Sequence, residues 1–142
     1  MNKKVLVTGG AGFIGSNLVR KLLKEGFEVT VFDDLSIGLH DNLPKNKKLR
    51  FIEGDVTNSK SVSTAVRTHP YVMHLAAQAF VPLSYEKPLR VAEVNAIGSL
   101  NVFKACLTHH TQRLVHVSSS EVYGTAQYTP MDEQHPLHPH NY

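Results

Sequence analysis

A glycine-rich stretch near the N-terminus, VLVTGGAGFIGSNLV (residues 5–19), constrains the fold of this chain more than any other feature. The β-branched run Lys3–Thr8 predicts a short buried strand. The run after the glycines predicts an amphipathic helix, because the apolar residues Ile14, Leu18 and Leu22 recur every four residues. The stretch therefore predicts a strand, a tight turn and a helix in direct succession.

The turn between this strand and this helix is a candidate phosphate-binding loop. Gly10, Gly12 and Gly15 match the pattern G-x-G-x-x-G, and Gly9, Gly12 and Gly15 match G-x-x-G-x-x-G. Side chains here would keep a pyrophosphate away from the helix N-terminus, whose free N–H groups and dipole attract anions. The alternative is a glycine turn that only permits tight packing. The position of the motif, after a strand and at the start of a helix, favours the phosphate cradle.

The rest of the chain alternates between strand and helix patterns. Further strands are predicted at residues 28–32, 49–53, 71–75 and 113–117. A short helix capped by Asn58 or Ser59 and a long helix from Pro88 to about His109 lie between them. The apolar stripe of the long helix is expected at Val91, Val94, Ile97 and Leu100. Such spacings require parallel pairing through right-handed crossovers. We therefore expect an α/β fold: a Rossmann-like, doubly wound parallel sheet with helices on both faces and strand order 3-2-1-4-5.

Two adjacent carboxylates follow the second predicted strand. Asp33 stands where dinucleotide-binding folds carry the acid that accepts hydrogen bonds from the ribose hydroxyls. A negative charge there repels a 2′-phosphate, so NAD is favoured over NADP. Asp34 is the competing candidate for the same role, and a carboxylate that only caps the strand end is the alternative.

Composition excludes several classes of protein. A hydrophobic content of 42% with 19% charged residues is typical of a globular domain and not of a disordered chain. The one dense basic patch, at residues 45–50, has no aromatic residues that would stack on bases, so no nucleic-acid partner is expected. No apolar run approaches the roughly 18 residues of a membrane span. With a single cysteine and no evident membrane segment, a cytoplasmic protein is expected.

Six motifs in series resemble one protein family. TGGAGFIGSNLV, FDDLSIG, EGDVTN, HLAAQ, EVNAIGSLNV and VSSSEVYG occur in this order over essentially the whole chain. Together they resemble the N-terminal half of the extended short-chain dehydrogenases/reductases, the NAD-dependent nucleotide-sugar epimerases and dehydratases. The resemblance implies that residues 1–142 form an incomplete NAD-binding Rossmann domain, truncated before the C-terminal substrate-binding part.

The resemblance also implies which residues meet the cofactor. Asp55 and Val56 would contact the adenine ring, Leu75 to Ala77 the nicotinamide side, and Asn95 would support the site. With the glycine loop and the two adjacent aspartates, the expected cofactor-binding residues are Gly9, Gly12, Phe13, Ile14, Gly15, Asp33, Asp34, Asp55, Val56, Leu75, Ala76, Ala77, Asn95 and Ser118.

In such a family a tyrosine phenolate removes a proton from a sugar hydroxyl while hydride passes from C4 to NAD, and a lysine four residues later lowers the pKa of the tyrosine. Ser119 matches the hydroxyl that assists at the reacting oxygen. The sequence contains no Y-x-x-x-K. The family spacing places the tyrosine one residue beyond Tyr142, or at Tyr142 itself if the preceding loop is shorter. We therefore expect this chain to bind NAD and to turn over poorly or not at all.

Glu121 bears on the outcome of the reaction. In the dehydratase branch an acidic residue at this position removes the C5 proton, and an aspartate just before it protonates the departing C6 hydroxyl. Here Ser120 replaces that aspartate. Related epimerases carry similar S-E-V-Y-G runs, so epimerisation and 4,6-dehydration both stay open, with Ser119 and Glu121 as the expected catalytic residues.

Two other classes of function fit the same motifs: a non-catalytic NAD-binding sensor module, or a simple NAD(P)-dependent reductase. The expected partner is a nucleotide-diphosphate sugar, and the full-length protein is expected to form a homodimer. His135, His138 and His140 lie in a loop broken by prolines, so no metal site is expected.

Overall fold

A five-stranded parallel sheet forms the centre of the molecule. The computed structural model describes residues 3–140. The strands are β1 (Lys4–Thr8), β2 (Glu28–Asp33), β3 (Leu49–Glu53), β4 (Tyr71–His74) and β5 (Arg113–His116). Their order is β3-β2-β1-β4-β5, and all four pairs are parallel. The predicted fold class and strand order are therefore confirmed, and each strand agrees with its predicted range to within one residue.

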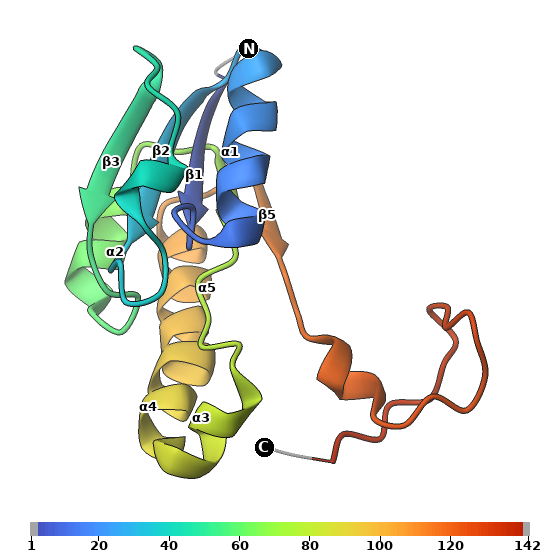
Figure 1. Ribbon diagram of the computed structural model, residues 1–142. Coiled ribbons are helices and arrows are strands. Elements are labelled where there is room, and N and C mark those ends of the chain that lie inside the picture. Colours follow the sequence, from blue (N-terminus) through green and yellow to red (C-terminus); the bar gives the residue numbers. More distant parts are fainter. Residues whose placement is uncertain (1–2, 141–142) are drawn as a thin grey trace.

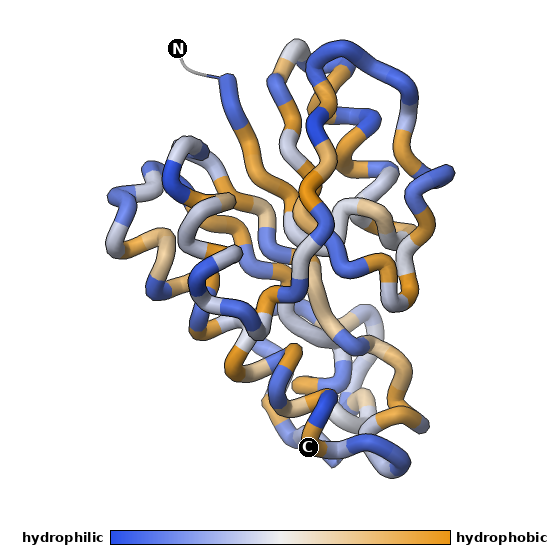
Figure 2. Tube along the Cα trace, turned by 90° about the vertical axis from the view of Figure 1, so that its left-hand side faces the viewer, coloured by the Kyte–Doolittle hydropathy of each residue, from blue (hydrophilic) through white to orange (hydrophobic). Residues whose placement is uncertain are grey.

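Helices cover both faces of this sheet (Figure 1). Helix α1 (Phe13–Lys24) packs on one face, where Val19 and Leu22 join the inward side chains of β1 and β2. Helices α2 (Ser59–Val66) and α5 (Ser99–Thr108) pack on the other face, around Phe32 and Val72. The central strands β1 and β2 are largely apolar and buried between these layers (Figure 2), as strands covered on both faces are.

The buried face of α1 differs from the predicted stripe. Ile14 is 64% exposed, so its expected place in the stripe was wrong, while Gly15, Val19 and Leu22 are buried. Residues 14 and 18 each precede a residue of the contact row by one position, and Gly15, which must lie against the Gly9–Gly10 backbone, determines which row of the helix faces inward. At its far end the helix stops as expected, because Gly26 adopts φ of +86°.

The long helix predicted from Pro88 is divided. It runs through α4 (Pro88–Ala92), the π-helical turn η2 (Glu93–Gly98) and α5, and a short helix α3 (Val81–Glu86) precedes it. Val91 and Val94 are buried as predicted, but Ile97 and Leu100 are 51% and 58% exposed, so that part of the stripe was wrong. A row with a strict spacing of three drifts around a helix of 3.6 residues per turn. The π turn shifts the register further, and Val102, Ala105 and Cys106 become the buried row of α5.

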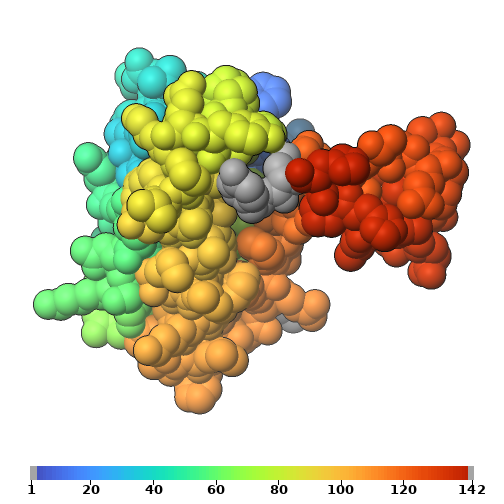
Figure 3. Space-filling view, turned by 90° about the horizontal axis from the view of Figure 1, so that it is seen from below, coloured from blue at the N-terminus to red at the C-terminus, as the bar shows by residue number. Residues whose placement is uncertain are grey.

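Beyond β5 the chain leaves the body of the molecule. A 3₁₀ turn, η3 (Ser120–Tyr123), begins this segment, which projects away from the sheet and helices (Figures 1 and 3). A second 3₁₀ turn, η1 (His40–Asn42), lies in the loop after β2. Strand β5 is an edge strand of the sheet, and its Val115 is 44% exposed. Because β1 pairs in parallel with both β2 and β4, the carboxyl ends of these three strands lie at the same edge of the sheet.

Candidate functional site

Backbone contacts explain two of the loop glycines. Gly9 has a φ of +69°, and a Cβ on it would lie 2.7 Å from the Ala76 nitrogen at the end of β4. A Cβ on Gly15 would collide with the Gly9 carbonyl oxygen and lie 2.7 Å from the Gly10 Cα. These two positions therefore require glycine for packing between the loop, α1 and β4.

Gly12 differs from both. A Cβ on Gly12 would meet only the Gly9 carbonyl oxygen, at 3.4 Å, which is ordinary contact. Gly12 is the N-cap of α1 and lines a cleft at the carboxyl edge of the sheet. As glycine has no side chain to cap the helix, and the first turn holds no acidic residue, the N-terminal N–H groups of α1 are suited to an anion. Packing within the protein does not require glycine here, and the absence of a side chain leaves room for a ligand to approach the helix N-terminus.

The cleft, which we term the first cleft, lies along the ends of β1, β2 and β4. Its lining residues are Gly9, Gly12, Phe32, Asp33, Asp34, Ser36, Ile37, Gly38, Gly54, Val56, Leu75, Ala76, Ala77, Gln78, Ala79 and Val94. Most are small or apolar, and the carboxylates stand at the β2 end. Small residues at the strand ends allow a flat ligand to lie close to the backbone.

Asp33 is held rigidly in this cleft. Its side chain is buried, one carboxylate oxygen accepts the Ala11 N–H at 2.9 Å, and the other accepts the Leu35 N–H at 2.9 Å. Asp33 thus joins the glycine loop to the loop after β2. A carboxylate oxygen has two lone pairs, so each can still accept a hydroxyl from a ligand.

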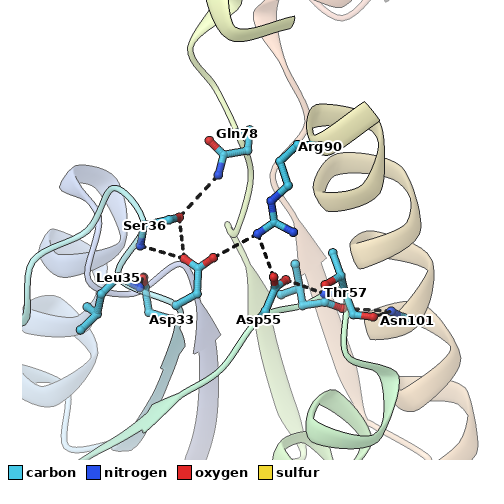
Figure 4. A network of polar contacts seen from close by, with 10 residues as sticks. Asp33, Leu35, Ser36, Asp55, Thr57, Gln78, Arg90 and Asn101 are labelled. Carbon is cyan, nitrogen blue, oxygen red and sulfur yellow. Dashed lines mark hydrogen bonds and ion pairs between the residues drawn. The ribbon is translucent and has the colours of Figure 1, made fainter. Parts of the chain in front are cut away.

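Arg90 of α4 connects the ends of β2 and β3. One guanidinium nitrogen, Nη2, lies 2.8 Å from Asp55 Oδ2 and 3.4 Å from Asp34 Oδ2. Gln78 reaches across the cleft toward Ser36, with 3.5 Å between Nε2 and Oγ (Figure 4). These contacts join loops that belong to different halves of the doubly wound sheet.

A buried polar chain runs from β1 through β4 to the π-helical turn. His74 Nδ1 lies 2.6 Å from Thr8 Oγ1, and His74 Nε2 lies 3.0 Å from Ser99 Oγ, which donates to the Asn95 carbonyl at 2.6 Å. Ser99 must accept from His74, so Nε2 carries the imidazole proton and Nδ1 accepts from Thr8. Burial, with a smaller effect from nearby His116, lowers the pKa of His74 to about 4. His74 is therefore a neutral structural histidine.

The buried polar chain holds the segment after β4 at both of its ends. The Leu75 and Ala76 N–H groups donate to Thr8 Oγ1 at 3.2 and 3.3 Å. The Asn95 side chain accepts the Gln78 N–H at 2.7 Å and donates to the Gln78 carbonyl at 3.0 Å. The wall of the first cleft is therefore fixed by β1 on one side and by the π-helical turn on the other.

A second hollow adjoins the first cleft and shares residues 77–79 with it. Its lining residues are Ala77, Gln78, Ala79, Phe80, Val81, Ser84, Val91, Asn95, Ser118, Ser119, Glu121, Val122 and Pro139. Ser119 Oγ accepts the Glu121 N–H at 3.2 Å, which caps the turn η3. The two cavities thus form one continuous surface from Asp33 to Glu121.

The structure brings together most of the residues that the sequence singled out. The first cleft holds Gly9, Gly12, Asp33, Asp34, Val56, Leu75, Ala76 and Ala77; the second hollow holds Asn95, Ser118, Ser119 and Glu121. Phe13 and Ile14 are exposed at the start of α1 and line neither cavity, and Gly15 is buried below the loop. Asp55 lines neither cavity and pairs with Arg90. Tyr142 lies outside the described residues.

Sequence reasoning missed Arg90, Gln78 and His74. Arg90 stands in a helical pattern that gives no sign of a distant carboxylate, and the partner of a buried histidine is not encoded locally. Across residues 3–140, no three histidine, cysteine or acidic residues gather in a group that could hold a metal ion. None of the helices in this range is long and apolar enough to cross a membrane.

Comparisons with known proteins agree with this arrangement. A family model described as GDP-mannose 4,6 dehydratase matches residues 6–142. UDP-glucose 4-epimerase of Lactobacillus helveticus is 39% identical over 140 residues, which cover 97% of this chain and 42% of that protein. A dTDP-glucose 4,6-dehydratase of Streptomyces niveus is 36% identical over 146 residues, covering 96% and 44%.

Solved structures show the same likeness. UDP-glucose 4-epimerase of Thermus thermophilus, in complex with NAD, superposes with a TM-score of 0.87 at 39% identity and covers 97% of this chain and 45% of that one. The chain therefore spans less than half the length of the relatives that it matches.

Proposed function

Because the chain belongs to the family described as GDP-mannose 4,6 dehydratase, we propose that it binds NAD as the cofactor part of an enzyme that acts on a nucleotide-diphosphate sugar. One observation carries the proposal. The first cleft, which has the features of a dinucleotide site, opens into a second hollow that contains Ser119 and Glu121. The groups proposed to bind the cofactor and those proposed to act on the substrate would thus lie on one surface.

The residues of the first cleft fit NAD. The uncapped N-terminus of α1 suits a pyrophosphate, and Gly12 leaves the space that its approach needs. Asp33 suits the ribose hydroxyls, with Asp34 next to it, and the two negative charges disfavour the 2′-phosphate of NADP. Val56 would bound the adenine ring and Leu75 to Ala77 the nicotinamide side.

In the second hollow Ser119 would hydrogen-bond the reacting oxygen of the sugar, and Glu121, which lines the same hollow, would exchange a proton with the substrate. Bound NAD would supply the hydride acceptor that oxidation at C4 of the sugar needs. We favour epimerisation over 4,6-dehydration, because Ser120 offers a hydroxyl where elimination of the C6 hydroxyl needs a carboxylic acid. Dehydration is the second candidate, and the presence of Glu121 is the observation in its favour.

Further parts of the proposal concern the whole enzyme. The α4–α5 region exposes Leu89, Ile97, Leu100 and Leu107, which supports a homodimer built on these helices. The lone cysteine, Cys106, is compatible with a cytoplasmic location. Because the sequence holds no Y-x-x-x-K, we propose that residues 1–142 alone bind NAD with little or no turnover.

Two measurements test this function. Calorimetric titration of the 142-residue chain should show NAD binding well above NADP binding, and NMR should show no conversion of UDP-glucose or dTDP-glucose. The protein extended through a Y-x-x-x-K motif should convert UDP-glucose to its C4 epimer without added cofactor. No NAD binding would refute the cofactor assignment. A 4-keto-6-deoxy product would favour a dehydratase, and consumption of added NADPH would favour a reductase. NAD binding without turnover by the extended protein would favour a sensor module.

A further inference from the structure

The loop after β2 is fastened to the glycine loop at one residue, Ala11. The Asn42 side-chain amide donates to the Ala11 carbonyl oxygen at 2.8 Å, and the Leu39 N–H donates to the same oxygen at 3.2 Å. The Ala11 N–H donates to Asp33 Oδ2 at 2.9 Å. Ala11 is fully buried, so the end of β2 and the loop beyond it hold both of its polar main-chain groups.

Asn42 is itself anchored on two sides. It is the last residue of η1, its N–H donates to the Leu39 carbonyl at 3.0 Å, and its own carbonyl accepts from the Arg20 guanidinium on α1. The two loops also touch through their main chains, because a Cβ on Gly38 would lie 2.8 Å from the Ala11 carbonyl carbon. The Asn42 amide therefore reaches Ala11 from a fixed position.

These contacts direct the Ala11 carbonyl toward residues outside the first cleft. Gly9 and Gly12 line that cleft, whereas Ala11, Leu39 and Asn42 do not. The peptide group between Ala11 and Gly12 has little intrinsic resistance to rotation, because glycine accepts a wide range of φ values. Gly12 is the N-cap of α1, so a rotated peptide would bring a carbonyl oxygen, with its partial negative charge, to the end of the helix that suits an anion.

We propose that Asn42 is a positioning residue for the phosphates of the dinucleotide, which holds the Ala11 carbonyl out of the first cleft; this rests on the proposed binding of NAD. A carbonyl oxygen that faces a pyrophosphate repels it, so the site binds NAD best when that oxygen is paired elsewhere. The Leu39 N–H, at 3.2 Å, is the longer of the two hydrogen bonds. Without the Asn42 amide the carbonyl is therefore only partly held.

A double-mutant cycle on NAD binding tests this role by calorimetric titration of the whole 142-residue chain. Asn42→Leu replaces the amide by an apolar group of similar size and should weaken NAD binding about tenfold. Gly12→Ala already hinders the anion and also restricts rotation of the peptide. In that background Asn42→Leu should therefore weaken binding by less than about threefold, because the two residues act on the same contact.

The matched control is Asn17→Leu. The Asn17 amide also donates to a main-chain carbonyl at 2.8 Å, that of Phe13, but on the exposed side of α1. Its loss should change NAD binding by less than about twofold in either background, as expected for a surface substitution.

A purely structural role for Asn42 predicts a different result. Effects at independent sites add, so Asn42→Leu would then cost the same factor in both backgrounds, and that result overturns the inference. Unchanged NAD binding by Asn42→Leu in the unsubstituted background also overturns it. If the unsubstituted chain does not bind NAD, the proposed function fails first, and the role of Asn42 fails with it. Should Asn42→Leu not fold, Asn42→Ala, which removes the same amide without adding bulk, takes its place in the cycle.

Discussion

Alanine substitutions at Gly15 and Gly12 should separate packing from ligand binding in the same loop. At Gly15 the three nearest atoms to a new Cβ are all backbone atoms of Gly9 and Gly10, the Gly10 Cα at 2.7 Å, and none can move without distorting the loop. Overpacking of this kind costs about 1–3 kcal/mol, sometimes more. We expect Gly15→Ala to lower the free energy of unfolding by about 3 kcal/mol.

Gly12→Ala should leave the fold almost unchanged. The new Cβ would stand 3.4 Å from the Gly9 carbonyl oxygen, and the φ of −73° suits alanine. Alanine is a poorer N-cap than glycine, but it also restricts the unfolded chain, so the net change in stability should stay within about 1 kcal/mol. The methyl group would instead face the anion. The loss of one charge-assisted hydrogen bond to a pyrophosphate, about 1.5–3 kcal/mol, corresponds to roughly 10- to 100-fold weaker NAD binding.

Urea unfolding with and without NAD measures both effects. At a concentration 100 times its dissociation constant, NAD should stabilise the unsubstituted chain by about 2.7 kcal/mol. At that same concentration a variant with 100-fold weaker binding gains only about 0.4 kcal/mol. Each variant is the control for the other, since both add one methyl group within the loop. The reasoning is refuted if Gly12→Ala keeps the full stabilisation by NAD, or if Gly15→Ala is as stable as the unsubstituted chain.

Two further predictions concern the buried polar chain. The pKa of His74 is about 4 in the folded chain and 6.5 in the unfolded chain. Between these values the unfolded chain binds a proton that the folded chain does not. The stabilisation by neutral His74 is therefore complete above pH 6.5, and the free energy of unfolding falls by up to about 3 kcal/mol as the pH is lowered toward 4. Urea unfolding from pH 7.5 to 4.5 should show a shallower decline for His74→Gln, whose amide offers the same acceptor and donor; equal slopes would contradict the neutral assignment. Asn95→Ala removes both hydrogen bonds to the Gln78 main chain, so hydrogen exchange of the Gln78 amide should become about tenfold faster. The control is Asn101→Ala, which removes the hydrogen bonds to the Val56 and Thr57 carbonyls instead. An unchanged exchange rate of the Gln78 amide in Asn95→Ala would show that Asn95 does not hold this segment in place.

Local patterns predicted the elements well where one cause determines them. Asn58 caps α2 through the Ser61 N–H, as a short polar side chain before a helix should. Gly26 ends α1 because the left-handed conformation excludes most other residues. The strand order also followed from the sequence, since short connections between parallel strands permit only a few topologies.

Predictions of which helix face is buried were less accurate. Ile97 and Leu100 appeared to continue an apolar stripe, yet the π-helical turn directs Gly98 and Val102 inward instead. The turn is stabilised by contacts outside the helix, including Asn95 with Gln78 and Ser99 with His74. A periodicity taken from one segment carries no information about those partners.

The sequence by itself determined that this protein is a doubly wound α/β domain with a glycine loop and an acidic residue at the end of the second strand, because each feature depends on residues that are neighbours along the chain. Only the tertiary structure decided what each group does within the site. It separated Gly15, which packs, from Gly12, which faces the cleft. It also placed Arg90 between Asp34 and Asp55. Contacts between side chains 35 and 56 residues apart form only when the strands have assembled into the sheet, and no local pattern encodes them.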